Sequence, residues 1–352
     1  MTTTNVKAFG TEAADAALKE MVIPRREVLA KDVEIEILYC GVCHSDLHMA
    51  RNDWGASAYP VVVGHEIVGK VISTGSSVTK CKAGDTVAVG CMVDSCRTCS
   101  PCKEDLEQYC QQGFTGTYNS PDKHLNLQTY GGYSEKIVVD EHFVLTVPSN
   151  LDLAAVAPVL CAGITTWSPL RHWKVKKGDK VAVVGLGGLG HMALKLANAL
   201  GAEVTLFSRS ASKTEEAKSL GAHEVVISTD EAQMQKVQGK FSLIIDTVPY
   251  VHDLNPYIGT LQTDGTLVLV GYLGPQTDIL NTFPLVWSRK SIAGSLIGGI
   301  AETQELLNFC GEHNIVSEIE IIKMQDINQA YERMLKSDVR YRFVIDMASL
   351  KG

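Results

Sequence analysis

Long hydrophobic runs are missing from this chain of 352 residues, since no apolar stretch reaches the length of a membrane-spanning helix. Positive charge is also scarce: the formal net charge is -8 at pH 7, and no basic stripe is available to contact phosphates. These two absences argue against a membrane protein and against a nucleic-acid-binding protein. The N-terminus, from Met1 to Lys7, lacks the charged and apolar regions of a signal peptide, so we expect a cytoplasmic protein.

Internal repeats and low-complexity segments are absent too. Hydrophobic residues make up 45% and charged residues 20% of the chain, which is the balance of an ordinary globular protein. A chain of this length exceeds what one hydrophobic core usually supports, so two domains are expected.

The part of the chain before Pro148 has the pattern of a β-rich domain. The segment from Val33 to Tyr39 alternates apolar and acidic side chains, which is typical of a half-buried strand. Further short apolar runs, separated by turn residues, are expected as strands at 61–63, 68–72, 86–89 and 136–139.

After Pro148 the pattern changes to alternating strands and helices. Continuous apolar runs spaced by helical segments indicate a parallel sheet covered on both faces, with strands at 181–184, 204–207, 225–227, 243–246 and 267–270. The tail from about Ser291 has helices near 303–310 and 327–336 and a closing strand at 341–346. Periodicity does not assign this tail to either domain. The predicted fold class is α/β, with a β-rich domain beside a doubly wound one.

A glycine turn follows the first of these parallel strands. Gly185 permits a tight turn, Gly187 lets the backbone approach a diphosphate, and Gly190 lets the next helix pack closely on the strand. That helix is amphipathic, and its first amides are free to bind phosphate. Turn glycines without a ligand are the alternative, but strand, turn, helix and second strand together predict a dinucleotide site. Its residues are Gly185, Leu186, Gly187, Gly188, Leu189 and Gly190.

The loop after the second strand indicates which dinucleotide binds. An NAD-specific site normally has an acidic residue near position 208, where it hydrogen-bonds to the adenosine ribose. This chain has Ser208, Arg209 and Ser210 there, and Lys213 follows shortly after. Hydroxyl and cationic groups suit a 2′-phosphate, so NADP(H) is predicted. The alternative is a loop whose charges only face solvent.

Four of the ten cysteines are crowded into one short segment, at Cys96, Cys99, Cys102 and Cys110. Four thiolates can close a tetrahedral shell around Zn²⁺ and leave no position for water, which predicts a structural zinc site. An iron–sulfur cluster is the main alternative. A disulfide pair is less expected in a reducing cytosol.

Three scattered segments offer a second set of zinc ligands. Cys43 stands among hydroxyl, carboxylate and imidazole side chains, His65 precedes Glu66, and Cys161 lies just before the nucleotide-binding segment. A Cys–His–Cys set would leave the fourth zinc position free for water or substrate, as a catalytic zinc requires. Spacing alone does not join these segments, and a single buried Cys or His is more often a packing residue.

The motif Gly64-His65-Glu66-x2-Gly69-x5-Gly75-x2-Val78 resembles the zinc signature of the medium-chain alcohol dehydrogenases. The four-cysteine segment and the glycine turn follow in that family's order, and the resemblance covers essentially the whole chain. Further motifs resemble the cinnamyl-alcohol-dehydrogenase-like branch, and most closely its bacterial NADPH-dependent aldehyde reductases of broad specificity. These motifs lie at 41–46, 160–165, 185–192, 294–298 and 340–346.

The resemblance implies roles for the second set of zinc ligands. Cys43, His65 and Cys161 would hold a catalytic zinc. Glu66 would be a possible exchangeable ligand, and Asp46 would orient the imidazole of His65. With the structural site, two Zn²⁺ per chain are expected.

The resemblance also implies residues that handle the proton and the dinucleotide. Ser45 would pass the substrate proton to the nicotinamide ribose and on to His48 at the surface. His44 would approach the pyrophosphate, while Thr165 and Ser295 would contact the rest of the cofactor.

In domain terms, the resemblance implies a GroES-like catalytic domain built from both chain ends, residues 1–153 and 291–352, with a structural zinc lobe at 91–112. A Rossmann domain that binds NADP(H), residues 154–290, would be inserted between them. A homodimer built across the nucleotide-binding domain is implied as well.

Apolar side chains must keep water away from the reacting carbon, and the candidates for this wall are Leu47, Trp54, Trp287, Leu296 and Ile297. Ordinary core packing is an equal alternative for each of them. Plant members of the branch carry a bulky Trp in the segment that matches Phe114 to Asn119. Gly116 stands at or next to that position here, so we expect a pocket of different shape.

Together these features predict a zinc-dependent oxidoreductase that transfers hydride between NADP(H) and a primary alcohol or aldehyde. Aldehyde reduction with broad aliphatic and aromatic specificity is the expected direction. One alternative is an NAD-linked polyol or formaldehyde dehydrogenase, which an acidic residue after the second strand would have favoured. Another is a nucleotide-binding protein without turnover, which loss of Cys43, His65 or Ser45 would have favoured.

Replacement of Ser208 by aspartate tests the dinucleotide assignment. A carboxylate at this position would accept hydrogen bonds from the ribose hydroxyls of NAD(H) and repel a 2′-phosphate. Ser208→Asp should therefore shift kcat/KM toward NAD(H). Steady-state rates with both dinucleotides measure this ratio, and an unchanged ratio would count against NADP(H).

Overall fold

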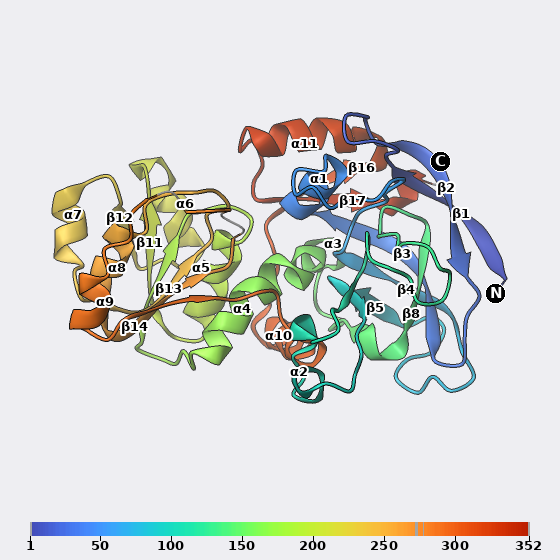
Figure 1. The fold of residues 1–352 in the computed structure, drawn as a ribbon, viewed down its shortest axis with the longest axis horizontal. Coiled ribbons are helices and arrows are strands. Elements are labelled where there is room, and N and C mark those ends of the chain that lie inside the picture. Colours follow the sequence, from blue (N-terminus) through green and yellow to red (C-terminus); the bar gives the residue numbers. More distant parts are fainter. Residues whose placement is uncertain (1, 272–273, 277, 351–352) are drawn as a thin grey trace. The chain divides into compact units, whose positions relative to one another are not determined.

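The computed structural model describes residues 2–271, 274–276 and 278–350. The chain forms two compact units, one made of residues 1–161 and 298–352 and the other of residues 162–297. Figure 1 shows both units, each with its own sheet.

The unit boundaries lie later than the expected 153/154 and 290/291. At the first boundary, α3 (Leu153–Val156) and η3 (Ala157–Leu160) pack on strands of the first unit. At the second boundary, β15 (Ser291–Gly294) pairs with a strand of the second unit. Short elements that the sequence pattern did not resolve therefore decide where each unit ends.

The first unit is built on a seven-stranded sheet in the order β16-β17-β3-β4-β5-β9, with β8 paired to β3 (Figure 1). Val33, Ile35 and Ile37 are buried while Glu34 and Glu36 are half-buried, as the alternating pattern predicts. The strands predicted in the first part of the chain are confirmed except for 61–63. The strands of this sheet are β3 (Asp32–Val42), β4 (Ile67–Thr74), β5 (Thr86–Val89), β8 (Lys136–Asp140), β9 (Leu145–Thr146), β16 (Ile319–Lys323) and β17 (Arg342–Asp346).

The run 61–63 makes only an isolated bridge, between Val61 and Thr11, so the strand prediction there is wrong. Its oxygens instead accept hydrogen bonds from a passing loop, since Tyr133 N–H donates to Val63 at 3.0 Å. Conversely, an antiparallel hairpin of β1 (Thr3–Gly10) and β2 (Lys19–Arg26) was not predicted. The first half of β1 is polar and exposed, which leaves little periodicity to recognise.

The C-terminal tail completes the first unit. β17 lies between β16 and β3, parallel to the first and antiparallel to the second, so the last strand is an interior strand of the sheet. The two tail helices predicted from the sequence are present. The remaining elements of this unit are α1 (His44–Ala50), β6 (Met92–Asp94), α2 (Ser100–Lys103), η1 (Glu107–Tyr109), β7 (Thr115–Gly116), η2 (Glu141–Phe143), α10 (Ile300–His313), η5 (Met324–Asp326), α11 (Ile327–Leu335) and η6 (Met347–Leu350).

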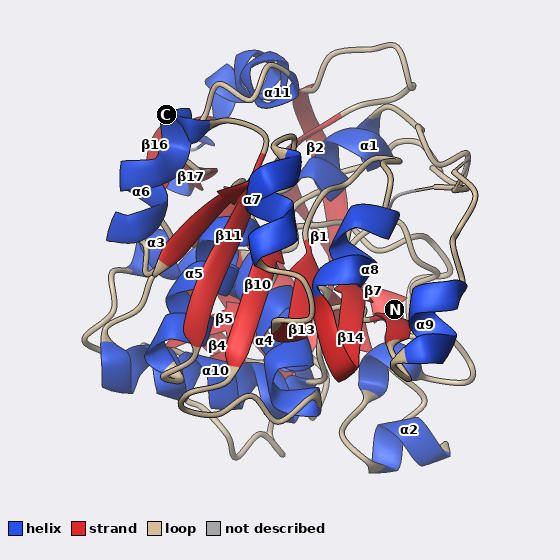
Figure 2. Cartoon of the chain, turned by 90° about the vertical axis from the view of Figure 1, so that its left-hand side faces the viewer, coloured by secondary structure: helices blue, strands red, loops and turns tan. Residues whose placement is uncertain are grey.

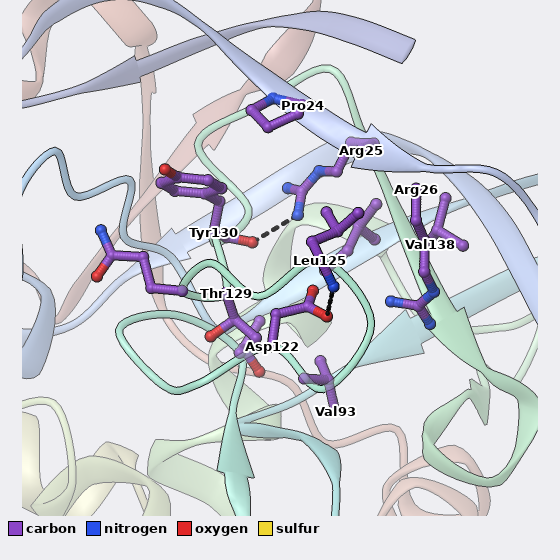
Figure 3. A pocket seen from close by; sticks show the side chains of 12 residues that line it. Pro24, Arg25, Arg26, Val93, Asp122, Leu125, Thr129, Tyr130 and Val138 are labelled. Atoms are coloured by element: carbon purple, nitrogen blue, oxygen red, sulfur yellow. Dashed lines mark hydrogen bonds between the residues drawn. The ribbon is translucent and has the colours of Figure 1, made fainter. Parts of the chain in front are cut away.

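A buried guanidinium ties β2 to the loop that precedes β8. Arg25 donates hydrogen bonds to the main-chain oxygens of Tyr130 and Gly131 at 2.7 and 2.8 Å and to the Ser134 hydroxyl at 2.8 Å. Figure 3 shows the small pocket beside it, with the guanidinium turned toward Tyr130. Burial lowers the pKa of Arg25 to about 9. This clamp holds in place the loop that carries Tyr133, whose hydroxyl lies 3.3 Å from Oδ2 of Asp46.

The second unit is a six-stranded parallel sheet in the order β12-β11-β10-β13-β14-β15. The five parallel strands predicted from the sequence are confirmed, and β15 is an unpredicted sixth. The strands are β10 (Lys180–Val184), β11 (Glu203–Ser208), β12 (Glu224–Ile227), β13 (Phe241–Asp246), β14 (Leu261–Leu269) and β15 (Ser291–Gly294).

Helices cover both faces of this sheet, as the continuous apolar strands predict. Ala182 and Ile244 form one apolar cluster with Met234 of α7 and Ile258 of α8, and Figure 2 shows these two helices in front of the sheet. α5 packs on β10 and β11. The helices are α4 (Ala162–His172), α5 (Gly190–Ala199), η4 (Ala211–Lys213), α6 (Thr214–Ser219), α7 (Glu231–Lys236), α8 (Asn255–Thr260) and α9 (Phe283–Trp287). Among the described residues no single helix has both the length and the composition of a membrane span, although one pair bent by 55°, 153–160 with 162–172, meets both criteria together.

Candidate metal centres and dinucleotide site

Four buried side chains from three loops of the first unit meet at one point: Cys43, His65, Glu66 and Cys161. Cys43 caps the N-terminus of α1 at the end of β3, and His65 and Glu66 directly precede β4. Cys161 follows η3, which packs on β3 and β4. Their ligand atoms all lie within 4.8 Å of one another. Pairing of β3 with β4 therefore brings together residues that the sequence alone does not join.

The donor set fits a zinc ion. In a tetrahedral site with zinc–sulfur bonds of 2.3 Å, two sulfurs lie about 3.8 Å apart, and the sulfurs of Cys43 and Cys161 are 3.8 Å apart. Nε2 of His65 is buried and has no hydrogen-bond partner among the described residues. An orphaned buried nitrogen beside two sulfurs is the arrangement that a metal ion would satisfy.

The two thiols influence each other strongly. The hydrogen bond between them lowers the pKa of Cys43 and raises the pKa of Cys161. Burial opposes ionisation of both thiols, because a buried thiolate loses its solvation. A bound cation would favour both thiolates, since metal ligands bind in deprotonated form.

Glu66 forms a buried ion pair with Arg342 of β17. Burial raises the pKa of Glu66 to about 7, although the charge of Arg342 acts in the opposite direction. The other carboxylate oxygen of Glu66 is buried without a hydrogen-bond partner. The sequence did not predict a role for Arg342. The one feature that could have indicated a buried ion pair is a charged residue between Tyr341 and Phe343 in a predicted strand.

Asp46 and Tyr118 both approach Nδ1 of His65. The Tyr118 hydroxyl is 3.0 Å from Nδ1 and the Oδ1 atom of Asp46 is 3.4 Å from it. Asp46 was a predicted neighbour of His65, and the structure brings the two side chains together. Tyr118 was not predicted to contact His65. The segment from Phe114 to Asn119 predicted only a difference in pocket shape, at Gly116.

Helix α1 places the predicted proton-handling residues near Cys43. The Ser45 hydroxyl is 3.6 Å from the Cys43 sulfur. Nδ1 of His48 forms a hydrogen bond of 2.7 Å with Asp53, and its ring is 5.4 Å from that of Trp54. Asp53 was not predicted.

The four cysteines of the lobe, Cys96, Cys99, Cys102 and Cys110, also converge, with ligand atoms within 4.8 Å of one another. Main-chain N–H groups point at the sulfurs: that of Cys99 donates to Cys96 at 3.3 Å, and that of Gln111 donates to Cys99 at 3.5 Å. Hydrogen bonds from Thr98 and Cys99 lower the pKa of Cys96 to about 5. Four sulfurs with amide donors around them are typical of a closed zinc–thiolate site.

The glycine turn of the second unit has the predicted strand–turn–helix geometry, running from β10 to α5. Gly185 has a φ of +89°, which favours glycine. A Cβ on Gly190 would collide with the Gly185 carbonyl oxygen, whereas at Gly187 the space is open. The turn thus has open space at Gly187, where the backbone was expected to approach a diphosphate. Leu186, Gly188 and Leu189 complete the turn.

The loop after β11 lies against this turn. Nζ of Lys213 donates a hydrogen bond of 3.2 Å to the Leu186 carbonyl oxygen. Ser208 ends β11, and its hydroxyl donates to the Ser210 oxygen at 2.9 Å. Arg209 is exposed and its guanidinium is 3.5 Å from the Tyr250 hydroxyl. The hydroxyls and the two cations are therefore grouped beside the glycine turn.

The other predicted contacts are divided between the units. His44, Leu47 and Trp54 belong to the first unit, where Leu47 is buried inside and Trp54 is exposed. Thr165 is buried in α4 of the second unit, and Ser295 follows β15, where its N–H donates to Leu269 at 3.1 Å. The remaining predicted pocket residues also lie in the second unit, exposed or half-buried: Trp287, Leu296 and Ile297.

Gly116 lies in β7, paired with Met92 of β6. A Cβ at this position would be 3.0 Å from the Ser120 hydroxyl oxygen, so a large side chain would require the neighbouring loop to move. Whether this alters the substrate pocket stays a prediction.

Comparison with known proteins agrees with this architecture. Residues 29–149 match the alcohol dehydrogenase GroES-like domain, and residues 188–312 match the zinc-binding dehydrogenase domain. The chain is 52% identical to the aldehyde reductase YahK of Escherichia coli, over 98% of this chain and 99% of that protein. It is also 52% identical to NADP-dependent alcohol dehydrogenase C 1 of Mycolicibacterium smegmatis, over 99% of each chain.

A solved structure has the same fold as this chain. The cinnamyl alcohol dehydrogenase SbCAD4 of Sorghum bicolor superposes with a TM-score of 0.94 at 43% identity, over 98% of both chains. The chain belongs to the zinc-binding alcohol dehydrogenase family, and the resemblance drawn from its motifs is confirmed.

Removal of one lobe thiol tests the structural site. Cys99→Ser should lower the zinc content from two per chain to about one and reduce the midpoint of thermal unfolding, because a structural zinc contributes to folding directly. Metal analysis and thermal melts measure both effects. The control is Cys81→Ser, since Cys81 lies in neither cluster. Two zincs and an unchanged midpoint in Cys99→Ser would contradict the assignment.

Proposed function

We propose that this protein is a zinc-dependent oxidoreductase that reduces small aldehydes with NADPH and oxidises the corresponding primary alcohols with NADP⁺. The observation that carries this proposal is the buried set of Cys43, His65 and Cys161, which offers three donors. The fourth member of the cluster, Glu66, is paired with Arg342, so one tetrahedral position would be left for substrate. When bound there, zinc supplies a Lewis acid for the substrate oxygen.

The residues around this set manage charge and protons. Arg342 balances Glu66, so the cluster does not gather uncompensated negative charge. The Ser45 hydroxyl lies 3.6 Å from the Cys43 sulfur. It would therefore be able to exchange a proton with the oxygen of a substrate bound next to Cys43. His48, held by Asp53, would pass that proton to solvent.

The dinucleotide role rests on the second unit. The glycine turn would bind the diphosphate, with its open side at Gly187. Ser208, Arg209 and Lys213 would surround a 2′-phosphate. The name of the Mycolicibacterium relative, which specifies NADP dependence, supports this choice. His44, Thr165 and Ser295 remain the proposed contacts to the rest of the cofactor.

The name of one relative and the residue at position 208 support the proposed substrate class. The Escherichia coli relative is named an aldehyde reductase, which supports aldehydes as substrates. The lack of an acidic residue at position 208 disfavours the NAD-linked polyol or formaldehyde dehydrogenase. No disulfide joins any of the ten cysteines, and a reducing compartment favours unpaired thiols, which supports a cytoplasmic location.

Substitution of a ligand of the proposed catalytic zinc tests this function. Cys43→Ser should lower the rate of NADPH consumption with an aldehyde about a thousandfold or more, because the bound Lewis acid would lower the activation free energy by several kcal/mol. The unfolding midpoint should change less than in Cys99→Ser. Rates, zinc content and thermal melts are measured for both variants, with Cys81→Ser as the control. Full activity of Cys43→Ser would refute the catalytic assignment.

We also infer that the protein forms a homodimer through the second unit. β15 is an edge strand, paired only with β14 on one side among the described residues. Helix α9 exposes Phe283 (64%), Val286 (82%) and Trp287 (77%) to solvent. An open strand edge beside exposed apolar side chains is the usual mark of an interface, and a second copy presents the same surface to it.

A charge placed on this helix tests the dimer. Val286→Lys should convert the dimer to a monomer in sedimentation velocity experiments, because a buried lysine without a partner is costly. Val22→Lys is the matched control, since Val22 is 63% exposed in the first unit and should leave the dimer intact. Equal sedimentation of both variants and the wild type would exclude α9 from the interface.

A further inference from the structure

His65 has one partnered and one unpartnered ring nitrogen. Nδ1 forms a hydrogen bond of 3.0 Å with the Tyr118 hydroxyl and lies 3.4 Å from Oδ1 of Asp46. Nε2 is buried without a hydrogen-bond partner among the described residues. All three side chains are buried, so the two oxygens are the groups that decide the tautomer of the imidazole.

Asp46 is already occupied by other donors. Its Oδ2 accepts the Cys43 N–H at 2.9 Å, and its Oδ1 accepts the Gly64 N–H at 3.1 Å. The Tyr133 hydroxyl lies 3.3 Å from Oδ2. Asp46 is thus fixed in place by the loops that carry the metal ligands, and it offers His65 only the longer of the two contacts.

The Tyr118 hydroxyl is closer to Nδ1 of His65 than the Asp46 carboxylate is, at 3.0 Å against 3.4 Å. A tyrosine hydroxyl can accept one hydrogen bond and donate another. The rings of Tyr118 and His65 also touch, with centroids 5.4 Å apart and planes tilted by 30°. One hydroxyl can therefore accept from His65 and donate to Asp46 at the same time.

We propose that Tyr118 is a positioning residue for His65, linking it to Asp46 in a chain of three buried hydrogen-bonding groups. Nδ1–H of His65 donates to the Tyr118 oxygen, whose own proton is donated to Asp46. This chain holds the neutral imidazole with its lone pair on Nε2, the form that binds zinc. The inference rests on the zinc-binding role proposed above for His65.

Tyr133 provides a matched control within the same cluster. It is a buried tyrosine whose hydroxyl contacts the other oxygen of Asp46, Oδ2. Phenylalanine at either position keeps the ring and removes only the hydroxyl. A general effect of losing a buried hydroxyl beside Asp46 would therefore be the same in both variants, whereas an effect on His65 would be specific to Tyr118→Phe.

The test compares zinc binding in the full-length holoenzymes. In competition with a chelator, Tyr118→Phe should bind its catalytic zinc about 10- to 100-fold more weakly than the wild type, the usual effect of losing the partner of a metal-bound histidine. Tyr133→Phe should stay within about threefold. With Co²⁺ in place of the catalytic zinc, the visible absorption bands should shift in Tyr118→Phe and not in Tyr133→Phe. Thermal melts of both variants separate these effects from a loss of stability.

Equal zinc affinities and equal Co²⁺ spectra in both variants would overturn the inference. His65→Asn separates it from the proposed function: if that variant keeps two zincs and full turnover, the zinc site itself is misassigned. If His65→Asn loses the catalytic zinc while Tyr118→Phe behaves as wild type, only the positioning role fails. The double variant Tyr118→Phe/Asp46→Asn should lose less than the sum of the single losses, and full additivity would contradict a shared chain.

Discussion

The first unit brings together a buried set of donors whose burial a cation would compensate. Two sulfurs 3.8 Å apart share a buried space with an imidazole nitrogen that has no partner. Burial of such groups without compensation costs several kcal/mol. A zinc ion bound there would remove that cost and would join the end of β3, the start of β4 and the residue after η3. The same interaction would therefore stabilise the first unit and provide the proposed reactive centre.

Charge balance around this centre is built from distant parts of the chain. Arg342 comes from the last strand and Glu66 from the loop before β4. Asp46 accepts main-chain N–H groups from both ligand loops, Cys43 and Gly64. The second unit has the complementary chemistry, because its glycine turn and cationic loop suit a phosphate-bearing anion. In the proposed reaction the first unit would supply the metal site for the carbonyl oxygen, and the second unit would supply the binding site for the hydride-donating dinucleotide.

The sequence predicted contacts between residues that are close together in the chain, but it did not predict most contacts between distant residues. The four lobe cysteines are close in sequence, so their spacing alone predicted their convergence. Cys43, His65 and Cys161 could be joined only through family resemblance, because strand pairing brings them together. Tyr118 and Arg342 contact partners 53 and 276 residues away, and no periodicity or spacing marks them. Likewise the run 61–63 is apolar because it is buried, and this pattern predicted a strand. Its main-chain hydrogen bonds go to a loop and not to a neighbouring strand.

The interior place of β17 has a consequence for how the protein is made. Cys43, His65 and Cys161 are synthesised before the second unit, whereas the strand that carries Arg342 is synthesised after it. Until then β3 lacks one neighbour and Glu66 has no counter-charge. The whole inserted nucleotide-binding unit can fold first, since domains fold as units during translation. Glu66 therefore gains its counter-charge only after the whole second unit has been synthesised, so the charge balance of this centre depends on a strand made long after its candidate metal ligands.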